Sequence, residues 1–212
     1  MAGTTLDAPE AQESRTHLAI PKLGPEDEPV FLEGMTLTSD AFMQIDFGTP
    51  CVELIEGRVY MAPSPSRLHQ EASSNLLRII FKQIEPKCGG KFLHAPFDFL
   101  ANERNVVQPD IMWLAPDHPE INSREKLSRA PSWALEILSP SSRAHDLRRK
   151  REIYAMAGVP HYWIADPQSK ALFGLELKDG AYFEVGVSKD GKFKAAPFAE
   201  IEIELALVFP WE

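Results

Sequence analysis

The chain has 212 residues, is 44% hydrophobic and 25% charged, and carries a formal net charge of −9. This composition excludes an intrinsically disordered chain, and the length predicts one domain with a buried core, since domains typically use about 100 to 200 residues. Two cysteines without CxxC spacing exclude a disulfide framework and a cysteine zinc site. No stretch approaches the ~18 apolar residues of a membrane helix and the N-terminus lacks signal-peptide features, so we expect a cytoplasmic protein without a membrane span.

The negative charge argues at first against a polyanionic partner such as DNA. Its distribution weakens that argument. Residues 1–50 hold nine acids and two bases, and the last thirteen residues hold four acids and no base. Residues 51–199 hold 20 bases and 18 acids, so the central part of the chain is slightly basic. The total charge therefore does not exclude nucleic acid.

The first third of the chain divides into an arm, a short helix and a hairpin. Residues 1–34 are polar and show neither a helical nor a strand period, so we expect a flexible acidic arm before a single domain over 35–212. A short helix is expected within 36–45, capped by Thr38 or Ser39. Alternating apolar and polar residues from Cys51 to Ala62 predict a β-hairpin that turns at Glu56-Gly57.

The longest helix is predicted over residues 66–84, because apolar positions recur there at spacings of three and four. We expect Pro86 and the Gly89-Gly90 pair to end it. Its buried face is expected to carry Leu68, Ala72, Leu76, Ile79, Ile80 and Phe81.

The remaining elements are mostly strands. Short runs rich in β-branched and aromatic residues predict strands at 91–101, 106–115, 132–139, 161–166, 171–177 and 181–187, the last two joined by the turn Lys178-Asp179-Gly180. A second helix is expected from Ala144 to Ala157. The pattern predicts an α/β fold of the α+β type, with a central sheet flanked by two helices.

Two acids lie among apolar residues in these runs. Asp110 follows Pro109 within 106–115, and Glu136 has apolar neighbours on both sides. An ionised carboxylate in a buried strand costs several kcal/mol unless it is paired or binds a cation. A lone acid of this kind is as often structural as functional. Two of them, about 25 residues apart on adjacent candidate strands, can converge on a divalent cation such as Mg²⁺, which prefers oxygen ligands.

A lysine lies on the apolar stripe of the second helix. At 100° per residue, Lys150 falls between Tyr154 and Ile153, so it turns toward the core and needs an anionic partner or a chemical task. A structural pair with Asp146, one turn earlier, is the alternative and is compatible with that task. The basic neighbours that point away are Arg148, Arg149 and Arg151.

Four segments together resemble a known family. They are VELIEGRVYMAPSPS followed by RLHQ, then VVQPDIMWL, APSWALEILSPSS and DLRRKREIYAMAGVPHYWIAD. In the order of these segments, in their spacing and in their residue types, the region from about Met35 to Tyr162 resembles the Uma2 family of restriction-endonuclease-like proteins, within the PD-(D/E)XK nuclease superfamily. The resemblance implies a restriction-endonuclease-like core with a central mixed β-sheet flanked by helices.

The resemblance also implies roles for individual residues. Asp110 matches the acid of the PD element and Glu136 the second acid, and both would bind Mg²⁺, or Mn²⁺ as a substitute, together with the main-chain carbonyl of Ile137. The usual superfamily lysine belongs at Leu138, which is a departure from the pattern. Lys150 matches the lysine that replaces it in Uma2-like sequences. The implied activity is a Mg²⁺-dependent endonuclease on DNA, with water activated by the ion and Lys150 assisting.

Two further residues and two alternative functions stay open. Glu53, in the family-like hairpin, is a candidate accessory catalytic acid, or else an exposed glutamate at a strand edge. His69 holds a family-like position but is more typical of a cap or core histidine. A catalytically silent nucleic-acid or protein-binding module of the same fold is the alternative to a nuclease, and a phosphodiesterase acting on RNA or a small nucleotide is a third hypothesis. A homodimer through the strands near 171–187 is expected by analogy with nucleases of this fold.

Overall fold

The structure, a computed structural model, describes residues 36–61, 64–139 and 143–211. The arm expected over 1–34 lies outside the described residues, and a single domain over 35–212 stays a prediction. The helices are α1 (Ser39–Phe42), α2 (Arg67–Ile79), α3 (Glu85–Cys88), α4 (Arg143–Ala157) and α5 (Leu205–Val208). The strands are β1 (Val52–Ile55), β2 (Arg58–Met61), β3 (Lys91–His94), β4 (Phe99–Asn102), β5 (Asn105–Val107), β6 (Ile111–Leu114), β7 (Trp133–Ile137), β8 (His161–Asp166), β9 (Ala171–Lys178), β10 (Ala181–Val187), β11 (Lys192–Phe193) and β12 (Ile203–Glu204).

Two sheets carry most of the strands. The larger has the order β10-β9-β8-β7-β6-β3, in which β7 and β8 run parallel and the other neighbours antiparallel. The smaller is antiparallel with the order β2-β1-β5-β4, and β11 pairs with β12 separately. The expected architecture, a central mixed sheet flanked by helices, is confirmed.

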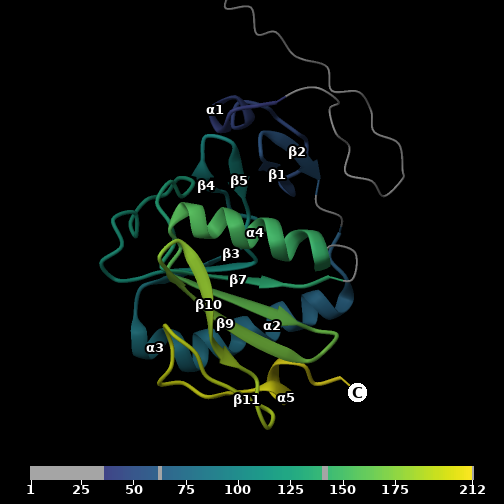
Figure 1. The fold of residues 1–212 in the computed structure, drawn as a ribbon, viewed down its shortest axis with the longest axis vertical. Helices are drawn as coiled ribbons and strands as arrows, with labels where there is room; N and C mark the ends of the chain where they lie inside the picture. The colour runs from purple at the N-terminus through teal and green to yellow at the C-terminus, as the bar shows by residue number, and fades with distance from the viewer. Residues whose placement is uncertain (1–35, 62–63, 140–142, 212) are drawn as a thin grey trace, which may run out of the picture.

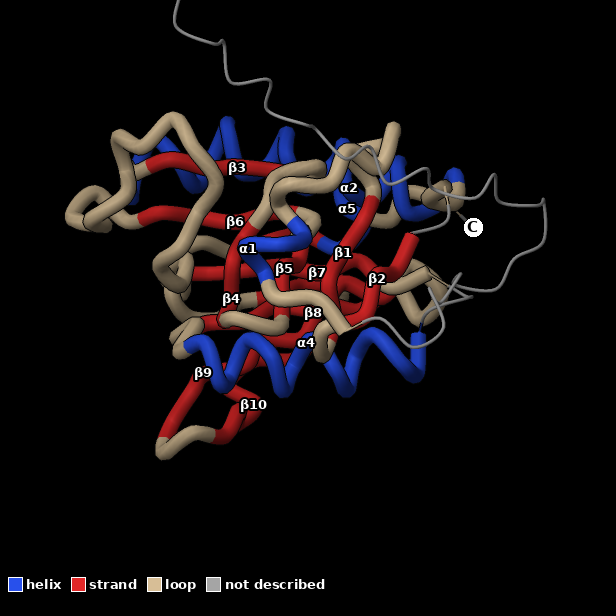
Figure 2. Tube along the Cα trace, turned by 90° about the horizontal axis from the view of Figure 1, so that it is seen from above, coloured by secondary structure: helices blue, strands red, loops and turns tan. Residues whose placement is uncertain are grey.

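The two long helices cover opposite faces of the larger sheet. Helix α2 packs on one face and α4 on the other (Figure 2). In Figure 1 the smaller sheet lies above α4 and the larger sheet below it, so α4 contacts both sheets, while another side of the helix faces solvent, where Met156 is 70% exposed. Side chains of α4 can therefore meet strand residues from both sheets.

Local sequence signals account for the short helix α1 and for the β1–β2 hairpin that follows it. Thr38 caps α1 by accepting a hydrogen bond from the Ala41 N–H at 3.3 Å. Strands β1 and β2 meet at Glu56 and Gly57, whose φ angles are 53° and 81°. Two positive φ angles at the turn are the requirement of a tight type I′ hairpin, which glycine meets at no steric cost.

The prediction for the end of the long helix is wrong for Pro86 and confirmed for the Gly89-Gly90 pair. After Ile79 the helix widens into a π-helical turn over Ile80–Ile84 and continues as α3, with Pro86 in its first turn, before ending at Gly89. The first turn of a helix tolerates proline because its missing N–H has no partner there. The predicted buried face is also wrong at two positions: Leu68 and Phe81 are 39% and 48% exposed.

Two expected strands each split between the sheets. Residues 91–101 form β3 in the larger sheet and β4 in the smaller, and residues 106–115 form β5 in the smaller and β6 in the larger. Pro96 and Pro109 lie at the two breaks. Each lacks the N–H that a continuous ladder would need, so the chain passes from one sheet to the other there.

None of the helices in the described part of the chain combines the length and the apolar character needed to cross a membrane. Strand β10 forms an edge of the larger sheet, where Phe183, Val185 and Val187 are exposed. A homodimer through this region stays a prediction.

Candidate active site

The alternation of side chains along β7 decides where Glu136 points. Trp133, Leu135 and Ile137 join the core beneath α2, whereas Ala134 and Leu138 join the core beneath α4. Because successive residues of a strand face opposite sides, Glu136 faces α4. Glu136 is therefore buried among apolar residues, and its exposed fraction is 8%.

Asp110 lies beside Glu136 at the start of β6. The antiparallel register pairs Ile111 with Leu135, and one step further along the same register brings Asp110 opposite Glu136. Asp110 is not inside a strand, as the sequence predicted, but directly before one. Its Oδ2 accepts a hydrogen bond from the Ile137 N–H at 2.7 Å. The Ile137 carbonyl lies on the same side of the strand, because the N–H and C=O of one strand residue point the same way.

Lys150 joins the two sheets by ion pairs. Its Nζ lies 3.2 Å from Glu136 Oε1 on the larger sheet and 3.0 Å from Glu53 Oε1 on the smaller. Lys150 is 8% exposed, so the inward orientation predicted from the helical period is confirmed. The alternative partner, the Asp146 side chain, lies outside the described residues. Lys150 contacts the carboxylates of Glu53 and Glu136 independently of Asp146.

Glu53 is buried rather than exposed at a strand edge, so that alternative is wrong. Val52 and Leu54 face the core beneath α1, and the alternation along β1 turns Glu53 toward α4. Its Oε1 also accepts a hydrogen bond from the Gln108 N–H at 2.7 Å. Glu53, Asp110, Glu136 and Lys150 are hereafter called the carboxylate cluster.

The chain is similar to known proteins in both sequence and fold. A family model described as "Uma2: Putative restriction endonuclease" matches residues 40–207, most of the chain. The chain belongs to the Uma2 family. A solved structure, the "putative nuclease belonging to DUF820" from Anabaena variabilis ATCC 29413, matches with a TM-score of 0.65 and 21% identity, over 82% of this chain and 98% of that chain. At that identity the likeness shows the fold alone. No curated protein matches the chain significantly.

The carboxyl group of Glu136 has an unusually high pKa. Burial raises its pKa from the ordinary 4.5 to about 8, and the negative charges of Asp110 and Glu53 add to that rise. Lys150 and the Tyr154 hydroxyl oppose it. Glu136 therefore keeps its proton near neutral pH in the metal-free protein, which lowers the negative charge of the cluster.

Tyr154 was not predicted as a site residue. It lies one turn after Lys150, is fully buried, and donates a hydrogen bond from its hydroxyl to Glu136 Oε1. Burial, followed by the Glu136 charge, raises the Tyr154 pKa well above its ordinary value, so the phenol stays a donor. Its position four residues after Lys150 was the available signal, because residues at i and i+4 share a helix face.

His69 lies in the capped first turn of α2, and its ring also contacts the cluster. Its main-chain N–H is bound by the capping Ser66 Oγ at 3.2 Å, while its ring Nε2 lies 3.2 Å from Asp110 Oδ2. The ring Nδ1 is buried and has no hydrogen-bond partner among the residues the structure describes. Only the family-like position in the sequence pointed to this residue.

We expect Glu136→Gln to stabilise the metal-free protein increasingly as pH rises. The folded protein keeps the Glu136 proton up to about pH 8, whereas the unfolded chain releases it near the ordinary pKa of 4.5. Between these values the folded state binds the extra proton, so rising pH favours the unfolded chain. Glutamine cannot ionise and escapes this loss. Melting temperatures measured across the window should show the variant gaining on the wild type; a constant difference would contradict the raised pKa.

Proposed function

We propose that this Uma2-family chain is a metal-dependent endonuclease that hydrolyses phosphodiester bonds of DNA. The observation that carries the proposal is the meeting of Asp110, Glu136 and Lys150 between the two sheets, with Glu53 on the opposite side of the lysine. Buried ionisable groups gathered at one place, with a strongly shifted pKa, are typical of catalytic sites. The family description and the nuclease-like fold support the same activity.

The donor set suits a divalent cation. When all are ionised, the three carboxylates and the single ammonium of the carboxylate cluster leave two negative charges, which one divalent cation balances. Mg²⁺ and Mn²⁺ favour carboxylate and carbonyl oxygens, which Asp110, Glu136 and the Ile137 main chain offer. Among the described residues, no three His, Cys, Asp or Glu side chains form a ready metal site. Two carboxylates with a main-chain carbonyl remain the proposed ligands.

Each residue of the cluster has a distinct proposed part in hydrolysis, which joins a water oxygen to phosphorus and releases one sugar oxygen with a proton. Asp110 and Glu136 would hold the ion, and a bound ion lowers the pKa of water and stabilises charge on the phosphate. Lys150 would orient the attacking water or neutralise the charge that develops on phosphate oxygens. Glu53 would hold the Lys150 ammonium in place, since the two are 3.0 Å apart.

The test is a metal-dependent cleavage assay. The protein is expected to nick or linearise supercoiled plasmid DNA when Mg²⁺ or Mn²⁺ is added, and to leave it intact in EDTA, as judged by gel electrophoresis. Cleavage that is unaffected by EDTA would contradict the metal dependence.

Two parallel measurements separate the alternatives. Calorimetric titration with Mn²⁺ should show uptake; its absence, together with intact DNA, would favour a catalytically silent binding module. Cleavage of RNA or of a small phosphodiester, with plasmid left intact, would favour a different phosphodiesterase at the same cluster.

A further inference from the structure

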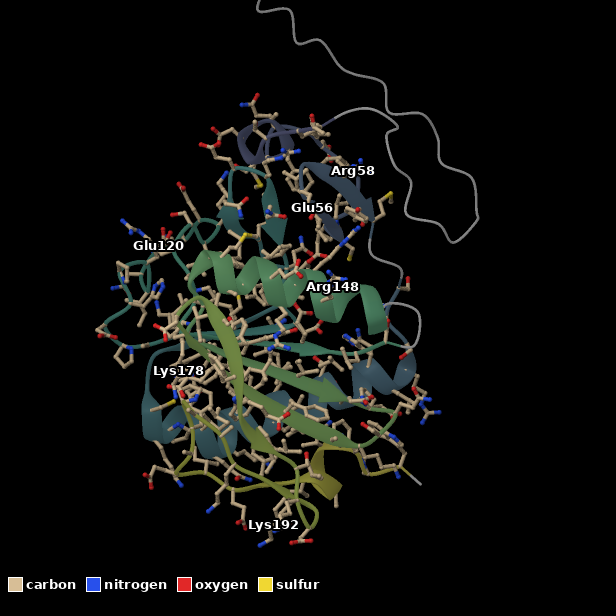
Figure 3. All side chains as sticks on the ribbon, in the orientation of Figure 1. Glu56, Arg58, Glu120, Arg148, Lys178 and Lys192 are labelled. Atoms are coloured by element: carbon tan, nitrogen blue, oxygen red, sulfur yellow. The ribbon has the colours of Figure 1, made fainter. Side chains whose placement is uncertain are left out.

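Three arginines of α4, at positions 148, 149 and 151, have three different surroundings. Arg148 Nε pairs with Glu152 Oε1 at 3.3 Å, and its side chain is 84% exposed (Figure 3). Arg151 Nη2 donates to the Tyr182 carbonyl at 2.7 Å. Arg149 Nη1 donates to the Tyr60 hydroxyl at 2.8 Å, and its guanidinium carbon lies 5.7 Å from the centre of the Tyr60 ring. Of these three arginines, Arg149 is the one whose described contacts are with the hairpin that carries Glu53.

Arg149 and Tyr60 stand at the rim of the carboxylate cluster. Tyr60 pairs directly with Glu53 in the β1–β2 ladder, so both side chains face α4. Directly opposed strand residues have Cβ atoms about 5 Å apart. Arg149 precedes Lys150 on the helix and is half-buried, whereas Lys150 is buried. The rim therefore carries a guanidinium beside the buried acids.

The partner of Arg149 is a neutral phenol rather than an acid. In the part of the chain that the structure describes, no carboxylate forms an ion pair with it. A guanidinium has five N–H donors, and the phenol takes one of them. Among the described residues, this half-buried guanidinium next to Lys150 has spare donors and no carboxylate partner, so it can take an anion supplied from outside. The fork of N–H groups fits two oxygens of one phosphate.

We propose that Arg149 binds a backbone phosphate of the nucleic-acid substrate at the rim of the carboxylate cluster, and that Tyr60 is a positioning residue that orients its guanidinium. This inference rests on the proposed nuclease function and adds a substrate contact to it. The balance of charge agrees: a divalent cation would neutralise the ionised cluster, and Arg149 then contributes the positive charge that meets the phosphate.

The experiment compares steady-state cleavage of a fluorescein-labelled DNA duplex by Arg149→Ala and by Arg148→Ala, a matched loss of one charge from the exposed face of the same helix. Arg149→Ala is expected to raise KM about ten- to a hundredfold, the range for losing a hydrogen bond to a charged group. The slope of log kcat/KM against log salt should become shallower by about 1, because one phosphate contact is lost. Arg148→Ala should change KM less than about twofold.

Two further variants test the geometry. Arg149→Lys keeps the charge but not the fork, so its KM should lie between those of the wild type and Arg149→Ala. Tyr60→Phe keeps the ring and removes the hydroxyl acceptor, so KM should rise in the same direction by a smaller factor. Melting temperatures for every variant identify losses of folding.

The outcomes separate this inference from the proposed function. Equal KM values for Arg149→Ala and Arg148→Ala, with normal wild-type cleavage, would overturn the phosphate contact alone. Arg149→Ala and Tyr60→Phe that both lower the melting temperature and leave KM unchanged would show a purely structural link, and would also overturn it. A wild type that does not cleave DNA with any added metal would overturn the proposed function and this inference together.

Discussion

Asp110→Asn is expected to reduce DNA cleavage by about 10²- to 10³-fold, the scale of losing one preorganised electrostatic group in an active site. The change keeps the size of the side chain and its capacity to accept the Ile137 N–H, so the fold at the start of β6 should survive. It removes the negative charge that would hold a divalent cation beside Glu136. Calorimetry should therefore show much weaker Mn²⁺ binding, and the plasmid assay should show intact DNA.

Asp117→Asn is the matched control for this change. Asp117 follows β6 on an exposed turn, so losing its charge should leave both cleavage and Mn²⁺ affinity unchanged. Cleavage that persists in Asp110→Asn at the level of Asp117→Asn would remove Asp110 from the active site.

Lys150→Met is expected to separate metal binding from turnover. Metal uptake should persist, because all three carboxylates remain, while kcat should fall by about 10² to 10³, the range for losing one preorganised group that stabilises developing charge. The metal-free variant should also be less stable. Removing one partner of a buried ion pair typically costs about 3–5 kcal/mol, because the buried Glu53 carboxylate would then lack its cation.

A divalent cation supplies the missing positive charge, so Mn²⁺ should raise the melting temperature of Lys150→Met more than that of the wild type. Arg148→Met on the exposed face of α4 controls for helix effects. Wild-type kcat in Lys150→Met would refute its catalytic part. A variant that stays unfolded even with Mn²⁺ would leave Lys150 only a structural role.

The site could be predicted in part because two of its residues depend on local periods. The two-residue period of β7 turns Glu136 to the face opposite Leu135, and the helical period of α4 turns Lys150 inward. Each orientation follows from the pattern of apolar residues next to it. The same apolar context singled out Asp110, to which the family resemblance gave a role, and the strand register then brings it opposite Glu136.

Other contacts could not be predicted, because they join segments far apart in the chain. Glu53 meets Lys150 only because the smaller sheet packs on α4, and His69 meets Asp110 only because α2 begins next to β6. Neither of these two contacts between distant segments produces a periodic pattern in the sequence. The same holds for Arg149, which helical geometry turns away from the core but which finds Tyr60 on the hairpin.

The sequence by itself determined the family, the α/β class, the Glu56-Gly57 turn and the inward orientation of Lys150, since each rests on local pattern or on matching segments. Tertiary structure decided the rest. Breaks at Pro96 and Pro109 sent neighbouring segments into different sheets, and their packing around α4 buried the acids together. Burial is what raises the Glu136 pKa to about 8, because desolvation depends on how many chain segments exclude water from one carboxylate.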